Sequence, residues 1–232
     1  MTTSITKFNG RANTTAKKNR EIKYIVIHYT AGITSKVGSA LSTAKYFAKE
    51  TTKASADFIV DDETIVQYSD DIRNRYCWHC GGSKLKTKGG SLYGKCTNAN
   101  SIGVEMCSKN LANKVTDPND INWDITVGTF ACTIELVANL CKEYNIPIEN
   151  VIRHYDVTGK KCPGIVGWNE DSGDVKEWLE FKSEVEKKLK VPSMSTEEYI
   201  ASLEKQIRDL TLERNGLKSK LERIKDITEG KL

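Results

Sequence analysis

The stretch Glu21-Ile-Lys-Tyr-Ile-Val-Ile-His28, followed by Tyr-Thr-Ala-Gly32, decides the fold. It is rich in β-branched and aromatic residues and too short for an independent helix, which predicts a buried strand ending at His28. Residues 101–107 (SIGVEMC) predict a second strand, in which apolar residues alternate with Gly103, Glu105 and Cys107. Residues 151–154 predict a third, short strand.

Helical periodicity is found between and beyond these strands. Residues 39–50 place Leu41, Ala44 and Phe47 on one predicted face, and residues 57–61 and 64–68 predict a β-hairpin. Residues 126–144 predict the longest helix of this part of the chain, with Thr126 as its N-cap. Its expected inward residues are Val127, Phe130, Ile134, Val137, Cys141 and Tyr144. Residues 174–190 predict another helix, with Val175, Trp178, Val185 and Leu189 inward. Strands interleaved with helices predict an α/β domain.

A change of composition near Pro192 predicts a domain boundary. We expect a domain over residues 1–191, a linker over 192–195 and a helical segment over 196–232. The last segment has eight basic and eight acidic residues and contains no Trp, Phe, Cys or Pro. Apolar residues recur there at heptad spacing, with Arg214 as the one charged exception, which predicts a coiled coil that makes the chain a homo-oligomer. The core positions are Ile200, Leu203, Ile207, Leu210, Arg214, Leu217, Leu221 and Ile224. A single helix packed back on the domain is the alternative.

Composition excludes several classes of protein. The chain has 232 residues, of which 38% are hydrophobic and 28% charged, and this argues against wholesale disorder. The net charge of +4 is modest and no basic stripe appears, so we expect no nucleic-acid partner. We expect neither a membrane span nor a signal peptide, because no apolar stretch approaches about 20 residues and the N-terminus lacks an apolar core.

The cysteines and histidines carry the candidate chemistry. Seven irregularly spaced cysteines predict a reducing compartment with most thiols free, and they leave open whether Cys77, Cys80, Cys96 and Cys107 form disulfides. The three histidines are His28, His79 and His154, and two of them end predicted strands. Imidazole nitrogen and thiolate sulfur are good zinc ligands, so His28, His154 and Cys162 form a candidate three-ligand site.

Three ordered motifs resemble the zinc-dependent N-acetylmuramoyl-L-alanine amidases, or type 2 amidases, whose family includes the peptidoglycan recognition proteins. The motifs are Tyr24-Ile-Val-Ile-His28-Tyr-Thr-Ala, Asn100-Ser-Ile-Gly-Val-Glu105 and His154 followed by Lys160-Lys-Cys162-Pro-Gly. The resemblance covers roughly residues 20–170. It implies a central mixed β-sheet flanked by α-helices, a Zn²⁺ cofactor, and cleavage of the amide between N-acetylmuramic acid and L-alanine in bacterial peptidoglycan.

The resemblance also implies roles for single residues. His28, His154 and Cys162 match the zinc ligands, Glu105 matches a general base and Lys160 a lysine that stabilises the oxyanion. His79, in Trp78-His-Cys-Gly, is a candidate substrate contact, with a structural loop residue as the alternative. Some relatives carry a catalytic Tyr on the second strand, where this chain has Ala56, and this favours Glu105 as the base.

The expected biological role is a phage endolysin that stays in the host cytoplasm until lysis and then acts at the cell wall. The alternatives are a cytoplasmic amidase that recycles muropeptides, a non-catalytic peptidoglycan-binding module, and a scaffold whose helical tail is the primary part. Cys162 argues against the binding module, because some recognition proteins that only bind lack this residue. Neither the peptidoglycan chemotype nor the host follows from the sequence.

Overall fold

The strand that carries His28 lies within a six-stranded sheet and ends at Tyr29, one residue later than predicted. In this computed structural model β3 (Tyr24–Tyr29) pairs with β7 (Ser101–Met106) on one side and β10 (Val151–Arg153) on the other. The sheet has the order β1 (Ile5–Lys7), β5 (Ile65–Gln67), β4 (Phe58–Val60), β7, β3, β10. Its neighbouring strands are parallel except β4 and β5, which form the predicted hairpin. The sheet is therefore mixed, and the predicted α/β class is confirmed.

The structure describes residues 4–86, 88–112, 117–190 and 196–229, and it divides the chain into two units, residues 1–190 and 191–232. The expected linker at 192–195 lies outside the described residues. Within these described ranges no helix is long and apolar enough to cross a membrane.

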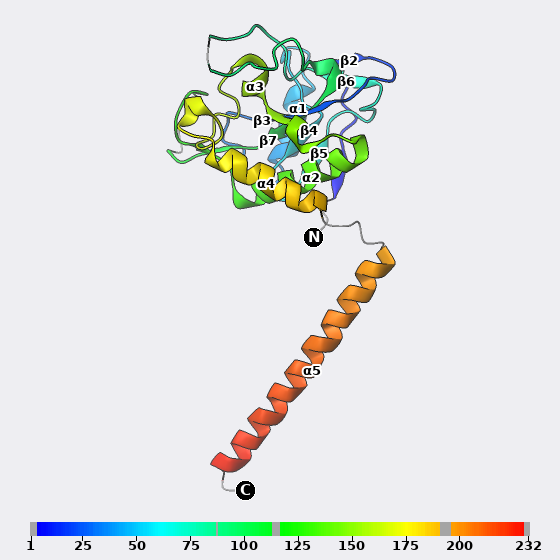
Figure 1. The fold of residues 1–232 in the computed structure, drawn as a ribbon, viewed down its shortest axis with the longest axis vertical. Helices are drawn as coiled ribbons and strands as arrows, with labels where there is room; N and C mark the ends of the chain where they lie inside the picture. Colours follow the sequence, from blue (N-terminus) through cyan, green and yellow to red (C-terminus); the bar gives the residue numbers. More distant parts are fainter. Residues whose placement is uncertain (1–3, 87, 113–116, 191–195, 230–232) are drawn as a thin grey trace. The chain divides into compact units, whose positions relative to one another are not determined.

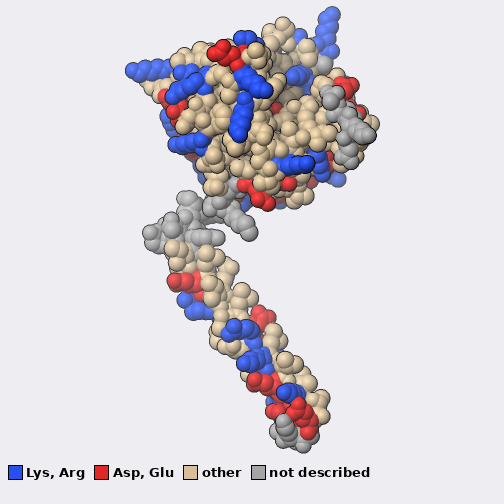
Figure 2. Space-filling model, turned by 180° about the vertical axis from the view of Figure 1, so that it is seen from behind, with Lys and Arg blue, Asp and Glu red and all other residues tan. Residues whose placement is uncertain are grey.

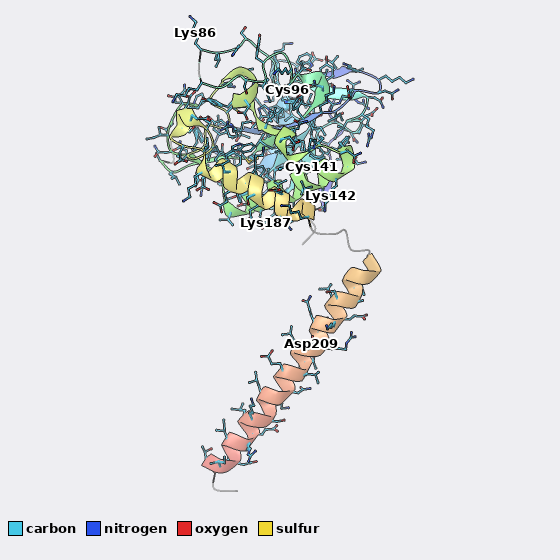
Figure 3. The ribbon with its side chains drawn as sticks, in the orientation of Figure 1. Lys86, Cys96, Cys141, Lys142, Lys187 and Asp209 are labelled. Carbon is cyan, nitrogen blue, oxygen red and sulfur yellow. The ribbon has the colours of Figure 1, made fainter. Side chains whose placement is uncertain are left out.

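Helices cover both faces of the sheet (Figure 1). On one face α1 (Ser39–Phe47) packs Ala40, Ala44 and Phe47 against Ile59 and Val66. On the other, α2 (Val127–Tyr144) packs against β7 and β4, and α4 (Lys176–Lys190) packs against α2. This second layer holds most of the core; Cys141, labelled in Figure 3, is 3% exposed within it.

The predicted N-cap of α2 is confirmed, whereas two residues that were predicted to face inward are exposed. Thr126 is the N-cap of α2, because its Oγ1 accepts a hydrogen bond from the backbone N–H of Thr129 at 3.1 Å. Val127 is 87% exposed and Leu41 37% exposed, since each lies at the first turn of its helix, just outside the covered face. Phe181 of α4, which the periodicity did not single out, is fully buried against Trp168 and Trp178.

Among its described residues, the stretch 69–100 contains a short strand and a 3₁₀ turn. β6 (Arg75–Cys77) pairs with β2 (Thr14–Ala16), and the turn spans Asn98–Asn100. A second small ribbon joins β8 (Lys109–Asn110) to β9 (Trp123–Asp124). The five-residue helix α3 (His154–Thr158) follows β10 directly, so His154 begins a helix instead of ending a strand.

The second unit contains one long helix, α5 (Thr196–Thr228). Its apolar heptad residues are exposed, from 39% for Leu203 to 67% for Leu221. A long C-terminal helix was predicted and is present; its assembly into a coiled coil stays a prediction.

Candidate metal centre and active site

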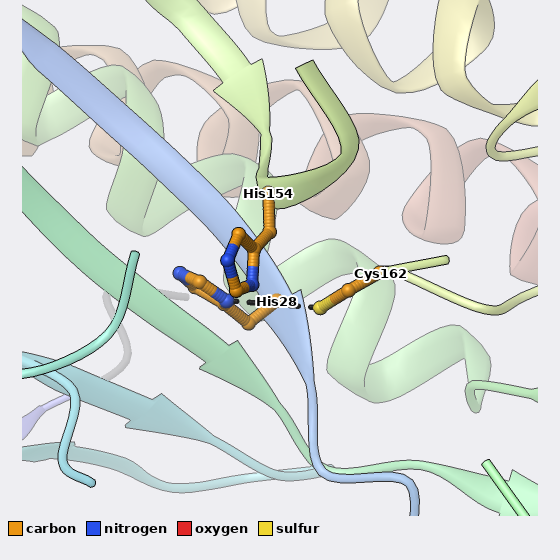
Figure 4. A group of neighbouring side chains, drawn as sticks. All are labelled: His28, His154 and Cys162. Carbon is orange, nitrogen blue, oxygen red and sulfur yellow. Dashed lines mark hydrogen bonds between the residues drawn. The ribbon is translucent and has the colours of Figure 1, made fainter. Parts of the chain in front are cut away.

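Three predicted ligands meet at one edge of the sheet. Ile27 of β3 is in register with Arg153 of the parallel strand β10, so His28 and His154, each the next residue, lie side by side. Cys162 follows α3 in the chain and lies beside these two histidines. The potential ligand atoms of the three side chains lie within 4.8 Å of one another. His28 Nδ1 is 3.6 Å from Cys162 Sγ, and the two imidazole rings are 4.8 Å apart (Figure 4).

The donor set fits a zinc ion. Burial lowers the pKa of His28, and it lowers that of His154 to about 3, so both imidazoles are in the neutral form that binds metals. His154 Nε2 is buried and has no hydrogen-bond partner among the described residues. A buried, unpaired ring nitrogen is costly unless another partner, such as a cation, satisfies it. Two imidazoles and one thiol, all buried, match the ligand chemistry of a three-ligand zinc site.

Glu105 and Lys160 line the same cavity, which has a volume of about 330 Å³ and also contains His28, His154 and Cys162. Glu105 lies in β7 directly opposite His28 of β3. Burial raises the pKa of Glu105 to about 7, while the positive charge of Lys160 opposes the rise. A carboxyl group that titrates near neutrality is suited to proton transfer.

Of the two adjacent lysines, Lys160 has the freer ammonium in this cavity. Lys161 Nζ donates a hydrogen bond to the carbonyl oxygen of Asn119 at 3.1 Å. The charge of Lys160, in contrast, acts on the pKa of Glu105 and of His154. These contacts favour Lys160 over Lys161 as the cation that faces a reacting group.

His79 lies in the wall of the cavity beside a predicted metal ligand, and its contact with substrate stays a prediction. Its side chain is 1% exposed, and His79 is also one of the residues that line the cavity. His79 Nδ1 is 3.1 Å from His28 Nε2, and His79 Nε2 is 3.3 Å from Ser101 Oγ. The imidazole therefore contacts a predicted metal ligand from its far side.

Four polar residues that the sequence analysis did not single out surround His79: Arg20, Asp57, Asn98 and Ser101. The Asp57 carboxylate is fully buried and lies 3.8 Å from His79 Nε2 and 3.4 Å from the guanidinium of Arg20. Asn98 Oδ1 accepts hydrogen bonds from the backbone N–H groups of His79 and Cys80 at 3.0 and 2.8 Å. The one available sequence signal was an acidic residue, Asp57, directly before the apolar run of β4.

Two other sequence observations have structural counterparts. Position 56 is an alanine, which has no hydroxyl group, and its side chain is fully buried. Cys77, Cys80, Cys96 and Cys107 are buried thiols that form no disulfide in the structure.

Comparisons with known proteins agree on one family. The family profile described as N-acetylmuramoyl-L-alanine amidase matches residues 18–165. The N-acetylmuramoyl-L-alanine amidase CwlL of Bacillus licheniformis is 34% identical over 167 residues, covering 66% of this chain and 39% of CwlL. A probable N-acetylmuramoyl-L-alanine amidase of the same species is 32% identical over 162 residues, with the same coverage. The chain thus spans about two fifths of the length of these relatives.

Solved structures show the same fold. The catalytic domain of XlyA superposes with a TM-score of 0.57 at 26% identity, covering 78% of this chain and 99% of that domain. A mutant endolysin from Bacillus subtilis gives a TM-score of 0.55 at 27% identity, covering 78% of this chain and 98% of that protein.

Proposed function

Because the chain belongs to the N-acetylmuramoyl-L-alanine amidase family, we propose that it is a zinc-dependent hydrolase that cleaves the amide between N-acetylmuramic acid and L-alanine in bacterial peptidoglycan. The observation that carries the proposal is the cluster of His28, His154 and Cys162 in one cavity with Glu105 and Lys160. The ligand roles, the zinc and the catalytic roles are parts of this proposal.

The chemistry divides among five side chains. A zinc ion held by His28, His154 and Cys162 would supply Lewis acidity toward the substrate carbonyl and a more acidic water. Glu105 accepts the proton of the attacking water and delivers it to the leaving nitrogen of L-alanine, which a partly buried carboxylate with a raised pKa can do. The Lys160 ammonium faces the oxygen on which negative charge develops, and one preorganised group of this kind typically contributes about 3–4 kcal/mol.

We infer an endolysin role, in which the protein remains in the cytoplasm of a phage-infected host until the membrane is breached and then degrades the wall. The similarity to a mutant endolysin supports this role. A cytoplasmic amidase that recycles muropeptides is the second enzymatic candidate, and a non-catalytic binding module is the third.

Two substrates separate these candidates. An endolysin releases new L-alanine amino groups from intact sacculi, whereas a recycling amidase acts on soluble muropeptides and leaves sacculi largely untouched. A binding module sediments with sacculi and releases no amino groups. Mass spectrometry of the products must show intact stem peptides that begin with L-alanine; cleavage at another bond would overturn the proposed reaction.

We also propose that α5 joins copies of the chain into a homo-oligomer. Seven of its eight heptad core residues are apolar, and their exposure supports an unpartnered seam. Several catalytic units on one stalk would raise their effective concentration on a polymeric wall. Light scattering should give a multiple of 26.0 kDa for the full chain. The full-length variant Leu210→Asp/Leu217→Asp should give a smaller mass, and residues 1–191 should be monomeric. A monomeric full chain at micromolar concentration would contradict the seam.

A further inference from the structure

Behind His28, buried polar groups form a line that ends at the Asp57 carboxylate. We propose that His79 and Asp57 are positioning residues, which hold the His28 ring with Nδ1 turned toward the metal. This inference rests on the proposed zinc site and deepens it, because it adds residues that act on the metal through the His28 ring.

The distances give the line its direction. His28 Nδ1 faces Cys162 Sγ at 3.6 Å, so His28 Nε2 is the nitrogen left over, and it meets His79 Nδ1 at 3.1 Å. The far nitrogen of His79 lies 3.3 Å from Ser101 Oγ and 3.8 Å from Asp57 Oδ2. Both side chains of the His79–Asp57 pair are almost fully buried, at 1% and 0% exposure, so water does not compete for these contacts.

Only one arrangement of protons satisfies every group when His28 Nδ1 binds a cation. His28 then carries its proton on Nε2 and donates it to His79 Nδ1. His79 in turn carries its proton on Nε2, which points toward the acceptors Asp57 and Ser101. Ser101 can accept, because its own hydroxyl donates to the carbonyl oxygen of Thr97 at 2.6 Å. Metal-bound histidines commonly gain their tautomer and orientation from the hydrogen-bond partner of the second ring nitrogen, and here that partner is the His79 imidazole.

The surrounding structure keeps this line rigid. Asp57 Oδ2 accepts a hydrogen bond from the Gly103 backbone N–H at 2.8 Å, and Arg20 balances its charge. Gly103 leaves room for the His79 ring, since a Cβ there would approach the His79 Cγ to 2.6 Å. The close packing against Gly103 and the two backbone hydrogen bonds to Asn98 leave His79 little freedom to turn.

The test compares two substitutions of similar size, His79→Gln and His79→Leu. Gln retains a hydrogen-bonding group near His28 Nε2, and Leu fills the space without one. We expect Leu to weaken zinc affinity about 10–100-fold in competition with a chelator, the usual effect of losing such a partner, and Gln to restore most of it. The melting temperatures of the metal-free variants are measured in parallel. If the Gln and Leu variants lose the same zinc affinity, and also lose the same metal-free stability, His79 has only a structural role and the proposal is overturned.

Nuclear magnetic resonance gives a second readout on the unsubstituted protein, which has only three histidines. Long-range ¹H–¹⁵N spectra of the zinc-loaded protein should show protons on Nε2 of both His28 and His79. A His28 proton on Nδ1 would overturn the proposed line even if the Leu variant fails to fold. A parent protein that binds no zinc would overturn the zinc site as well, so the two failures are distinguishable.

A different observation, the charge of Arg214, bears on how two α5 helices pair. We propose that they pair antiparallel, a refinement that rests on the self-association proposed above. In a parallel pair the two Arg214 side chains would share one core layer, and Lys220 would face Lys225 of the second copy. Both contacts place like charges together, against a single favourable pair of Glu213 with Lys218.

An antiparallel register removes both conflicts. It places Leu203 opposite Leu221 of the second copy and Leu210 opposite Arg214, so no core layer holds two arginines. It also brings Glu204 near Lys218, and Arg214 near Glu213, of the other chain, and it leaves one like-charge pair, Glu213 with Glu213 of the second copy. Acidic and basic side chains are interspersed along the face of α5 seen in Figure 2, as such pairing requires. Charge complementarity of this kind selects helix orientation.

Cross-linking in the full-length protein tests the orientation. Leu203→Cys and Leu221→Cys proteins are mixed, oxidised with glutathione disulfide, and analysed by peptide mass spectrometry. We expect bridges that join position 203 to position 221 in the mixture, and no bridge between identical positions in either protein alone. A bridge between two copies of position 203 would show parallel pairing and overturn the proposal, as would the absence of any bridge in the mixture. A full chain that is monomeric by light scattering would overturn self-association itself.

Discussion

Replacing Glu105 with glutamine removes a proton acceptor and little else. Glutamine has nearly the same size, so the packing of β7 against β3 and the three ligand side chains remain in place. Among the described residues that line the cavity, Glu105 is the only carboxylate. No neighbouring acid is therefore available to take over its role.

The expected loss of rate follows from the absence of a second carboxylate among the described residues of the cavity wall. General acid–base groups typically contribute about 10²–10⁴ in rate, or about 3–5 kcal/mol at about 1.4 kcal/mol per tenfold. We expect Glu105→Gln to lower the rate of amide cleavage at least about 100-fold while zinc content and melting temperature change little. The assay counts new amino groups released from purified sacculi under saturating zinc. Glu50→Gln, at an exposed position in the same catalytic unit, is the matched control and should retain full activity.

Two results would refute this reasoning. A fall of less than about threefold in Glu105→Gln would move the base elsewhere, and Ala56 excludes the second-strand tyrosine of some relatives as its replacement. A large fall accompanied by loss of zinc would mean that Glu105 acts on the metal site and not on the proton.

Three further predictions concern pH, packing and the core. Because Glu105 acts as a carboxylate, kcat/KM should fall as the pH falls. Burial raises the pKa of Glu105 to about 7 even with Lys160 nearby, and a bound zinc lowers it again, so we expect the midpoint between the ordinary pKa of 4.5 and about 7. A profile that is flat from pH 5 to 8 would contradict this. Gly103→Ala should lower both the melting temperature and the zinc affinity, because the new Cβ meets the His79 ring, and unchanged values of both would show that the ring is free to move away. Phe181→Ala should cost about 3–5 kcal/mol of unfolding free energy in denaturant titrations, since this side chain is fully buried against two tryptophans, whereas a cost below about 1 kcal/mol would mean that the site collapses.

Local patterns in the sequence were enough to predict the main strands and helices. The apolar run ending at His28 predicted β3, the alternation at residues 101–107 predicted β7, and Thr126 predicted the start of α2 through its capping hydroxyl. These features depend on near neighbours in the chain. Val127 and Leu41 show the limit of periodicity, because the arc of a helix that is covered depends on the partner that packs on it.

The polar groups behind the site could not be predicted from the sequence, for a related reason. Asp57 and His79 lie far apart in the chain from His28, and only the pairing of β4, β7 and β3 brings them together. The strand order that sets this neighbourhood results from long-range packing. A motif can therefore indicate a ligand such as His28, whereas the partner of its second nitrogen becomes apparent only in three dimensions.

The most direct test of the central claim is the zinc content of the purified protein and of two cysteine variants, measured by elemental analysis together with amide cleavage. Cys162→Ser removes the proposed sulfur ligand, and Cys132→Ser is the matched control, since that half-buried thiol on α2 contacts the carbonyl oxygen of Asp62. The account predicts one zinc per chain and full activity for the parent and for Cys132→Ser, with the metal lost or weakened and hydrolysis abolished in Cys162→Ser. Stoichiometric zinc and full activity in Cys162→Ser would contradict it.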